Sequence, residues 1–250
     1  MASPTTAASG APSPRAGSSA EPSPPTGRRT ASDSSKRRPR RTGRKLFRFD
    51  RKQGYRFVAG ADEAGRGSLA GPLVAAAVLF DYERLSLREL RSLAVLNDSK
   101  QHTPEAREEL YPMVMRAASR AAIVSRCVRG IDTRGLHVTN VAALRDALVR
   151  VVRPGTLCLT DGFRVPDVGH DQRAVIDGDE TSAAIAAASI LAKVSRDRYM
   201  KRVDVLHPGW EFAAHVGYST PEHREAIERN GVSPLHRRSF QSIAYQQLAL

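Results

Sequence analysis

Two short apolar runs, separated by an acidic pair and a glycine-containing turn, constrain the fold of this chain more than any other feature. The runs cover residues 57–61 and 73–80, and their lengths and compositions are typical of buried β-strands. Asp62 and Glu63 follow the first run directly and precede Gly65-Arg66-Gly67. Because like charges repel strongly where the dielectric constant is low, two adjacent carboxylates beside an apolar strand require a compensating partner. The sequence therefore predicts a sheet-forming domain with a charged site where its first strand ends.

Helical and strand patterns alternate along the rest of the chain. Helices are predicted over about residues 82–93, 103–119, 139–152, 180–205, 221–230 and 241–250, and strands at 121–128, 156–160 and 172–176. In the helix predicted over 103–119, Thr103 suits the N-cap and Pro104 the first helical position. The helix predicted over 221–230 is ended by Gly231. Strands mixed with helices in this order favour an α/β layered domain.

The composition bounds the class of protein. At 250 residues with 41% apolar content, the chain is long enough for one domain with a substantial core. Its longest nearly unbroken apolar stretch, residues 69–80, is shorter than the roughly 20 residues that a bilayer span needs, and no apolar signal-peptide segment is visible. Cys127 and Cys158 have neither a CxxC partner nor zinc-type spacing. We therefore expect a cytoplasmic protein with buried, reduced thiols and no membrane partner.

Residues 1–45 differ from the rest of the chain. They contain no Phe, Tyr, Trp, Leu, Ile or Val, and they hold ten basic but only two acidic residues. Such a segment cannot bury enough apolar surface to offset its chain entropy, so we expect a disordered basic tail over 1–45 and a folded domain over 46–250. The basic run at 36–45, in a chain of net charge +13, is compatible with phosphate binding and equally with a solvated linker. An organellar transit peptide is a third reading, although no amphipathic helix supports it.

Two further carboxylates stand in positions like that of the acidic pair. Asp161 ends the predicted strand at 156–160, and Asp179 precedes the long predicted helix. Taken alone, Asp161 before a glycine is most often a turn residue, and Asp179 a helix cap. In a layered α/β domain, however, sites gather at strand ends, so we expect the four carboxylates to converge. Divalent cations such as Mg²⁺ would offset their repulsion, and two ions about 3.5–4 Å apart would clamp a phosphodiester for hydrolysis.

Strand geometry sets one condition on this site. Adjacent side chains of a strand point to opposite faces, so Asp62 and Glu63 can serve one site only if the chain bends there. Gly65 and Gly67 provide conformational freedom for such a bend and allow backbone amides to approach a nucleic acid.

These residues belong to an ordered set of motifs that resembles bacterial ribonuclease HII, the type 2 ribonuclease H family. The resemblance covers about residues 57–231 and is carried by Asp62-Glu63-Ala64-Gly65-Arg66-Gly67, Gly71-Pro72, Asn97-Asp98-Ser99-Lys100, Asp161-Gly162, Gly178-Asp179, the stretch 186–197 and the stretch 215–223. It implies a ribonuclease H-like α/β fold, with a mixed central sheet flanked by helices and a small helical C-terminal part. Thr160, where an aliphatic residue is expected, and Ser219, where glycine is more usual, depart from the pattern.

The resemblance also implies an activity. The enzyme would hydrolyse the RNA strand of RNA–DNA hybrids and incise 5′ of ribonucleotides embedded in duplex DNA, as in ribonucleotide excision repair, and it would leave 3′-hydroxyl and 5′-phosphate ends. Asp62, Glu63 and Asp161 would bind Mg²⁺ or Mn²⁺, with Asp179 as the fourth acidic residue of the site.

Substrate contacts follow from the same resemblance. Gly65, Arg66 and Gly67 would sense the 2′-hydroxyl, the group that distinguishes RNA from DNA at one position, and Tyr218 would pack on the sugar at that junction. Four further residues are candidate contacts to phosphates, with a capping loop or a solvated helix face as the alternative reading: Ser99, Lys100, Lys193 and Arg196. We expect a monomer whose partner is an RNA–DNA hybrid or ribonucleotide-containing duplex DNA.

Other residues are predicted to be structural. Asp197 is expected to pair with a basic neighbour, Trp210 to anchor packing, and His215 and His223 to be structural or phosphate-side polar residues. Two other functions remain compatible with the sequence at this point. A basic nucleic-acid-binding protein without turnover would explain the charge, and a two-metal nuclease acting on all-DNA duplex would explain the carboxylates.

Overall fold

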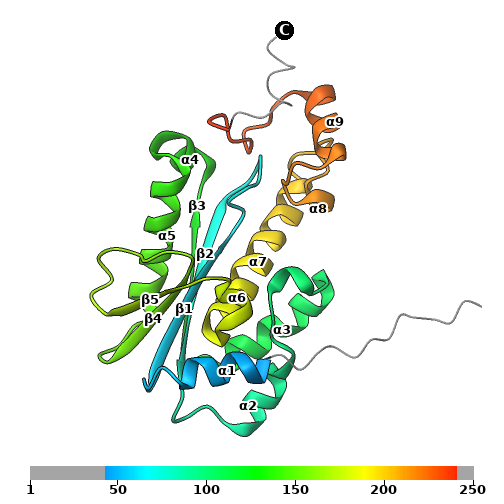
Figure 1. The fold of residues 1–250 in the computed structure, drawn as a ribbon. Helices are drawn as coiled ribbons and strands as arrows, with labels where there is room; N and C mark the ends of the chain where they lie inside the picture. Colours follow the sequence, from blue (N-terminus) through cyan, green and yellow to red (C-terminus); the bar gives the residue numbers. More distant parts are fainter. Residues whose placement is uncertain (1–42, 241–250) are drawn as a thin grey trace, which may run out of the picture. The chain divides into compact units, whose positions relative to one another are not determined.

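The structure, a computed structural model, describes residues 43–240, and their centre is a five-stranded sheet (Figure 1). Its strands, in the order β3-β2-β1-β4-β5, are β3 (Arg120–Arg126), β2 (Leu73–Asp81), β1 (Phe57–Ala64), β4 (Thr156–Asp161) and β5 (Asp171–Val175). The β3-β2 and β2-β1 pairs are antiparallel, whereas the β1-β4 and β4-β5 pairs are parallel. The predicted mixed sheet is therefore confirmed.

Helices connect and cover these strands. They are α1 (Gly43–Arg51), α2 (Leu87–Ser92), α3 (Pro104–Ala117), α4 (Val128–Arg134), α5 (Leu136–Val151), α6 (Gly178–Thr181), α7 (Ala183–Asp204), α8 (Phe212–His215) and α9 (Pro221–Asn230), with short 3₁₀ turns η1 (Leu93–Val95) and η2 (Ser99–Gln101). As predicted, Thr103 caps α3 by accepting a hydrogen bond from the Ala106 amide, and α9 ends at Gly231. The C-terminal helical part is confirmed up to α9, and the helix predicted over 241–250 lies outside the described residues.

Several predicted boundaries are wrong. The helix predicted over 82–93 begins only at Leu87, because Ser86 and Glu89 form a capping box there. The helix predicted over 180–205 is divided at Ser182, which caps α7 by accepting a hydrogen bond from the Ile185 amide. Helix α4 is an additional element that the sequence pattern does not reveal.

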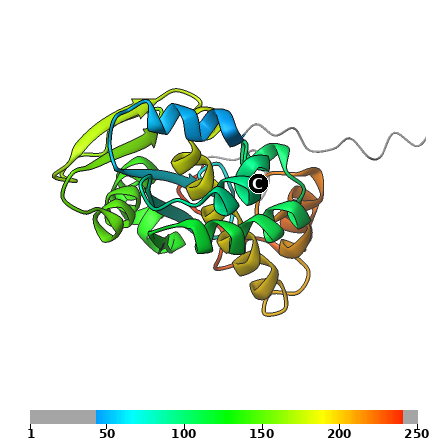
Figure 2. The same cartoon turned by 90° about the horizontal axis from the view of Figure 1, so that it is seen from below.

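The sheet separates two apolar layers, because alternate side chains of its strands point to opposite faces. On β2, every residue of which is buried, Ala76, Val78 and Phe80 pack in the layer that contains α1, α3 and α7. Four other apolar side chains of the strand, Leu73, Ala75, Ala77 and Leu79, pack in the layer that contains α5. Figures 1 and 2 show α7 and α5 on these two faces. The predicted arrangement of a sheet flanked by helices is confirmed.

A close approach fixes the start of α7 on β1. A Cβ atom on Gly60 would lie 2.1 Å from the backbone carbon of Ala184, so only glycine allows this contact. Asp50 of α1 holds the same helix end: its Oδ2 accepts hydrogen bonds from the Ala184 amide at 2.9 Å and from the Tyr82 hydroxyl at 2.7 Å. Helix α1 thus belongs to the fold, and since it begins at Gly43, the predicted boundary between 45 and 46 falls inside it.

Two further predictions concern location and thiols. Within residues 43–240, none of the helices is both long and apolar enough to cross a bilayer. Cys158 is buried as expected, but Cys127 is exposed, because it stands at the junction between β3 and α4. The tail predicted over residues 1–45 lies outside the described part of the chain up to residue 42.

Candidate active site

The acidic pair lies within β1 rather than after it. Asp62 and Glu63 pair with Ala76 and Ala75 of β2, and the strand continues to Ala64. The predicted end of the strand at Ala61 is therefore wrong, and the bend that a shared site would require is absent at the pair: the chain turns only at Gly65, whose φ of 86° suits glycine. Because β1 stays extended, the two carboxylates leave it on opposite faces. On its other edge, β1 pairs in parallel with β4 only as far as Ala61, so the acidic pair lies beyond the end of the β1–β4 ladder.

Asp62 lies on the α7 side of the sheet. Its side chain is only 9% exposed, and its Oδ1 accepts a hydrogen bond from the Glu63 amide at 2.8 Å. Burial raises the pKa of Asp62 to about 7, repulsion from Glu63 and Asp179 adds to this rise, and the Ser189 hydroxyl of α7 opposes it. The raised pKa of Asp62 reflects the energetic cost of placing two carboxylates together in a buried position.

Glu63 lies on the α5 side. Its Oε1 is 3.8 Å from a guanidinium nitrogen of Arg66. Burial raises the pKa of Glu63 and the charge of Asp161 adds to the rise, while Arg66 and the neighbouring amide of Asn140 lower it. Asn140 is completely buried, and apart from Glu63 its side chain has no hydrogen-bond partner among the described residues. The Asn140 amide is therefore a polar group held beside Glu63 without another partner.

Asp161 and Asp179 are brought together by the α6 turn. The Oδ1 atom of Asp161, at the end of β4, accepts a hydrogen bond from the Gly178 amide at 2.8 Å. Asp179 follows in α6, where it is buried and where Lys100 Nζ lies 3.6 Å from its Oδ2. Burial raises the pKa of Asp179 to about 6; Lys100 opposes the rise, and Asp98 and Asp161 add to it.

The four carboxylates therefore form one electrostatic group. Asp62 is repelled by Glu63 and Asp179, while Asp161 repels both Glu63 and Asp179. They come from β1, β4 and α6, which meet around the end of the β1-β4 ladder. The four carboxylates thus influence one another electrostatically, and their convergence around a common cation stays a prediction.

The chemistry of this group fits a divalent cation. All its donors are carboxylate oxygens, the ligands that Mg²⁺ and Mn²⁺ prefer, and a cation would relieve the repulsion that raises their pKa values. Among residues 43–240, no three acidic, histidine or cysteine side chains are already assembled as metal ligands, which agrees with the opposite faces taken by Asp62 and Glu63. Mg²⁺ is commonly held by one or two carboxylates, and water and substrate phosphates complete its coordination.

The Gly65-Arg66-Gly67 turn lies against the segment that carries Tyr218. The amides of Leu69 and Ala70 donate to the Gly217 carbonyl at 2.9 and 3.2 Å, so backbone bonds join the two segments. Buried Arg237 supports the turn by donating to the Arg66 carbonyl at 3.0 Å. The Arg66 side chain is 52% exposed, and Gly67 is exposed as well. The turn and the tyrosine thus present one surface.

The candidate phosphate contacts divide into accessible and inaccessible residues. The Lys100 side chain is 81% exposed beside Asp179. Lys193 is half-buried, with its Nζ 4.9 Å from the centre of the Tyr218 ring and 2.8 Å from Asp197 Oδ1. Lys100 is therefore accessible beside the carboxylate group, whereas Lys193 is engaged by Asp197 and the Tyr218 ring.

Two of these predicted contacts require correction. Arg196 is completely buried, and its guanidinium donates to the carbonyls of Pro72, Ala70 and Val216 at 2.8–2.9 Å. The prediction that Arg196 faces the same groove as Lys193 is therefore wrong. The Arg196 side chain points from α7 toward the protein interior. Ser99 is also buried, and its hydroxyl lies 2.9 Å from that of Ser189. Neither side chain is available to a phosphate.

The residues expected to be structural are so. Asp197 pairs with Lys193 and, at 3.8 Å, with Arg107. The Trp210 ring stacks on Phe212, and its Nε1 donates to the Gly231 carbonyl at 2.9 Å. The His215 and His223 rings stack at 4.0 Å, and His223 Nδ1 lies 2.8 Å from the Tyr218 carbonyl oxygen. The histidines thus hold the segment that presents Tyr218.

Sequence reasoning missed three polar residues of the site, namely Asp98, Asn140 and Ser189. Asp98 lies within a motif of the family resemblance, yet a lone aspartate in a loop gives no sign of burial. Asn140 and Ser189 occupy positions on the buried faces of α5 and α7, and a polar residue within an apolar helical stripe was the available signal.

Comparisons with known proteins agree with this geometry. A family model for Ribonuclease HII matches residues 59–243. A ribonuclease HII of Mycobacteroides abscessus is 49% identical over 187 residues, which are 74% of this chain and 77% of that protein.

Two solved structures share the fold. The ribonuclease H2 of Pyrococcus horikoshii OT3 aligns with a TM-score of 0.63 and 24% identity over 77% of this chain and 96% of that one. Bst-RNase HIII in complex with Mn²⁺ aligns with a TM-score of 0.61 and 17% identity over 88% of this chain and 76% of that one. The family model covers most of the folded part, including every carboxylate of the site, and the relative at 49% identity covers 74% of the chain. The chain therefore belongs to the ribonuclease HII family, nucleases that hydrolyse the RNA strand of RNA–DNA hybrids.

Proposed function

We propose that this ribonuclease also incises duplex DNA on the 5′ side of a single embedded ribonucleotide, leaves 3′-hydroxyl and 5′-phosphate ends, and depends on two divalent ions. The observation that carries the proposal is the group of four mutually repelling carboxylates, from three elements of the fold. Such a group costs stability without cations, and its all-oxygen donor set suits Mg²⁺ or Mn²⁺. The related Bst-RNase HIII fold has been solved with Mn²⁺.

Each residue has a proposed role in this reaction. Bound ions would supply charge stabilisation at the scissile phosphate and lower the pKa of an attacking water. Asp62, Glu63 and Asp161 hold the ions, and Asp179 adds the fourth negative charge to the site. Lys100, exposed beside Asp179, is positioned to bind the phosphate backbone.

Discrimination between RNA and DNA is assigned to the surface formed by the turn and Tyr218. The backbone of Gly65, Arg66 and Gly67 faces the 2′-hydroxyl, and the half-buried Tyr218 ring packs on the adjoining sugar. The backbone hydrogen bonds from Leu69 and Ala70 to Gly217 fix the position of the turn relative to Tyr218. All the groups assigned to the reaction lie in one chain, so we propose that a monomer suffices. Its substrates in genomic DNA imply action in the cytoplasm, in ribonucleotide repair.

The test is a cleavage assay on three duplexes of identical sequence: one with a single ribonucleotide, one RNA–DNA hybrid, and one all-DNA duplex. With Mg²⁺ or Mn²⁺ we expect a nick 5′ of the ribonucleotide, a product 3′ end that a polymerase extends, and no cleavage of the all-DNA duplex. Removal of the metal with EDTA should abolish the nick. Cleavage of the all-DNA duplex would instead identify a general two-metal nuclease, and binding without turnover would identify a non-catalytic nucleic-acid binder.

Asp62→Asn provides the matched variant. It should lower the cleavage rate by roughly 10³-fold or more, because it removes a charged metal ligand with little change in size. Glu109→Gln, an exposed carboxylate on α3, is the control and should cleave like the natural chain. Circular dichroism and melting temperatures should confirm that both variants fold. Full activity of a folded Asp62→Asn variant would refute the assigned role.

A further inference from the structure

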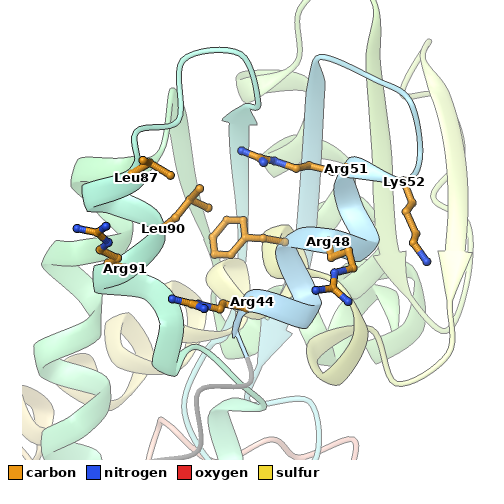
Figure 3. Close-up of a pocket in the computed structure, with 8 residues that line it drawn as sticks. Arg44, Arg48, Arg51, Lys52, Leu87, Leu90 and Arg91 are labelled. Carbon is orange, nitrogen blue, oxygen red and sulfur yellow. The ribbon is translucent and has the colours of Figure 1, made fainter.

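A second concave surface, separate from the carboxylate group, lies between α1 and α2. This pocket of about 510 Å³ is lined by eight residues, namely Arg44, Phe47, Arg48, Arg51, Lys52, Leu87, Leu90 and Arg91 (Figure 3). Five of the eight are cationic, and none is acidic. We call this surface the α1–α2 cradle.

The cations of the cradle have no acidic partner within the described part of the chain. None of the ion pairs formed among residues 43–240 involves any of its five cations. The only acidic residues of α1 and α2 are Asp50 and Glu89. Asp50 is buried against the start of α7, and Glu89 is engaged by Ser86 in the capping box. Because five cations around one concavity repel one another, an anionic ligand would relieve a cost that no ion pair among the described residues offsets.

The arrangement of the cations suits an extended ligand. Arg44, Arg48 and Arg51 follow one face of α1, whose opposite face is buried through Leu46 and Asp50. Figure 3 shows Arg44 and Arg51 extending from α1 toward α2 on either side of Leu90. The helical rise from residue 44 to 51 is about 10 Å, and one DNA strand places a phosphate about every 3.4 Å along its axis, so this row spans about three phosphates.

The cradle also has an apolar edge. Leu87 is 71% exposed at the cradle wall, and Leu90 is half-buried beside it. Sugar faces of a nucleic acid backbone offer apolar atoms between the phosphates, so a mixed wall of guanidinium groups and leucines complements a sugar–phosphate strand. Arginine's planar fork of donors also matches phosphate oxygens better than a point charge does.

Two sequence facts favour a long polyanion over a compact one. The segment from Lys36 to Lys52 contains ten basic residues and a single acidic one, the buried Asp50, so the basic character extends well beyond the cradle. The α1 wall of the cradle precedes residue 59, where the family model begins, so its basic residues are not among those that the model matches.

We propose that the α1–α2 cradle binds the sugar–phosphate backbone of duplex DNA, without regard to sequence or to the presence of a ribonucleotide. Helix α1 contacts α6, the helix of Asp179, so the cradle lies next to the elements that build the catalytic group. If the proposed function holds, the cradle keeps the enzyme on DNA while the catalytic site is empty of ribonucleotide. The binding itself requires neither metal nor cleavage.

The experiment measures binding of the full-length chain to an all-DNA duplex of about 30 base pairs by fluorescence anisotropy, in EDTA, over a series of salt concentrations. The test variant is Arg44→Gln/Arg48→Gln/Arg51→Gln. The control variant, Arg129→Gln/Arg134→Gln/Arg150→Gln, removes the same charge from exposed positions of α4 and α5. Gln keeps helix propensity high, and melting temperatures verify folding.

The cradle variant should bind the duplex about 10-fold or more weakly than the control variant. Its slope of log K against log salt should be smaller by about 2 to 3, because each phosphate contact contributes about 0.9. Equal affinity and equal slope in the two folded variants would overturn the proposal. Fluorescent poly-L-glutamate serves as the competing ligand class: if the cradle substitutions weaken its binding while DNA binding stays unchanged, the cradle is a site for acidic polypeptides. Because no metal is present, these results stand apart from success or failure of the cleavage assay.

Discussion

Arg196 is a charged residue whose role in the structure is internal support rather than contact with a substrate. In the sequence it stands three positions from Lys193 on a long helix, and charged helical residues are mostly exposed, so a substrate-facing arginine is the natural reading. In the structure its guanidinium satisfies the carbonyls of Ala70, Pro72 and Val216, which lie in the two segments that flank the Gly65–Gly67 turn and Tyr218. This burial depends on loops that are distant in sequence, so the apolar periodicity of the helix itself cannot predict it.

Replacing Arg196 should therefore affect stability first. Arg196→Met keeps much of the side-chain volume but leaves three buried carbonyls without their donor, which costs about 3 kcal/mol or more. We expect the melting temperature to fall on the order of 10 °C. Arg202→Met, at an exposed position of the same helix, is the control and should change it little. Equal melting temperatures for the two variants would show that Arg196 is not a structural link.

The four acidic residues could be singled out from the sequence together, for a physical reason. Asp62, Glu63, Asp161 and Asp179 each adjoin apolar runs or glycine, and a carboxylate in such a setting needs an explanation. Asp98 gave no comparable signal, because loop aspartates are common on protein surfaces, and Asn140 stood out only as a polar residue within an apolar helical stripe. Their burial beside Glu63 and Asp179 appears only after the sheet and helices are assembled.

Among the elements, β1 and the α6–α7 junction decide the form of the site. The sequence predicts the strand and the helix, but it ends the strand at Ala61 and gives no break at Ser182. The pairing partner β2 keeps β1 extended to Ala64, and a helix cap at Ser182 separates α6 from α7. Both features depend on cross-strand pairing and local capping competition, which the apolar periodicity of a single segment does not encode.

The segment that includes α8 and α9 is held by a histidine cluster whose protonation should matter. His223 Nε2 lies 3.1 Å from His236 Nε2, and both rings are buried. Burial lowers the pKa of each to about 4, and repulsion from His215 contributes in both cases. These histidines are therefore neutral in the folded chain at neutral pH.

The stability that this histidine cluster contributes should decrease as the pH is lowered. The unfolded chain protonates each histidine near pH 6.5, whereas the folded chain resists protonation down to about pH 4, so acidification through this window favours unfolding. The natural chain should exceed His236→Asn in stability at pH 7.5, and the difference should shrink by up to about 3 kcal/mol at pH 4.5. Urea unfolding of both proteins across this range measures it. A difference independent of pH would contradict the assignment of neutral, paired histidines.

At the scale of the whole molecule, one sheet divides the site between two layers. Asp62 leaves β1 toward α7, Glu63 leaves it toward α5, and Asp161 and Asp179 lie where the β1-β4 ladder ends. The same division explains why the carboxylates repel one another without forming a ready-made set of three ligands among the described residues. A cation bound at the end of the ladder would draw the two layers' carboxylates toward a common centre.

The most direct test of this account is anomalous diffraction from crystals of the full chain soaked in Mn²⁺. The account predicts an anomalous peak in contact with carboxylate oxygens from at least two of Asp62, Glu63 and Asp161, and loss of that peak in Asp62→Asn crystals. Mn²⁺ bound only at other acidic residues, or a peak that persists unchanged in Asp62→Asn, would contradict the claim that these carboxylates converge to hold the catalytic metal.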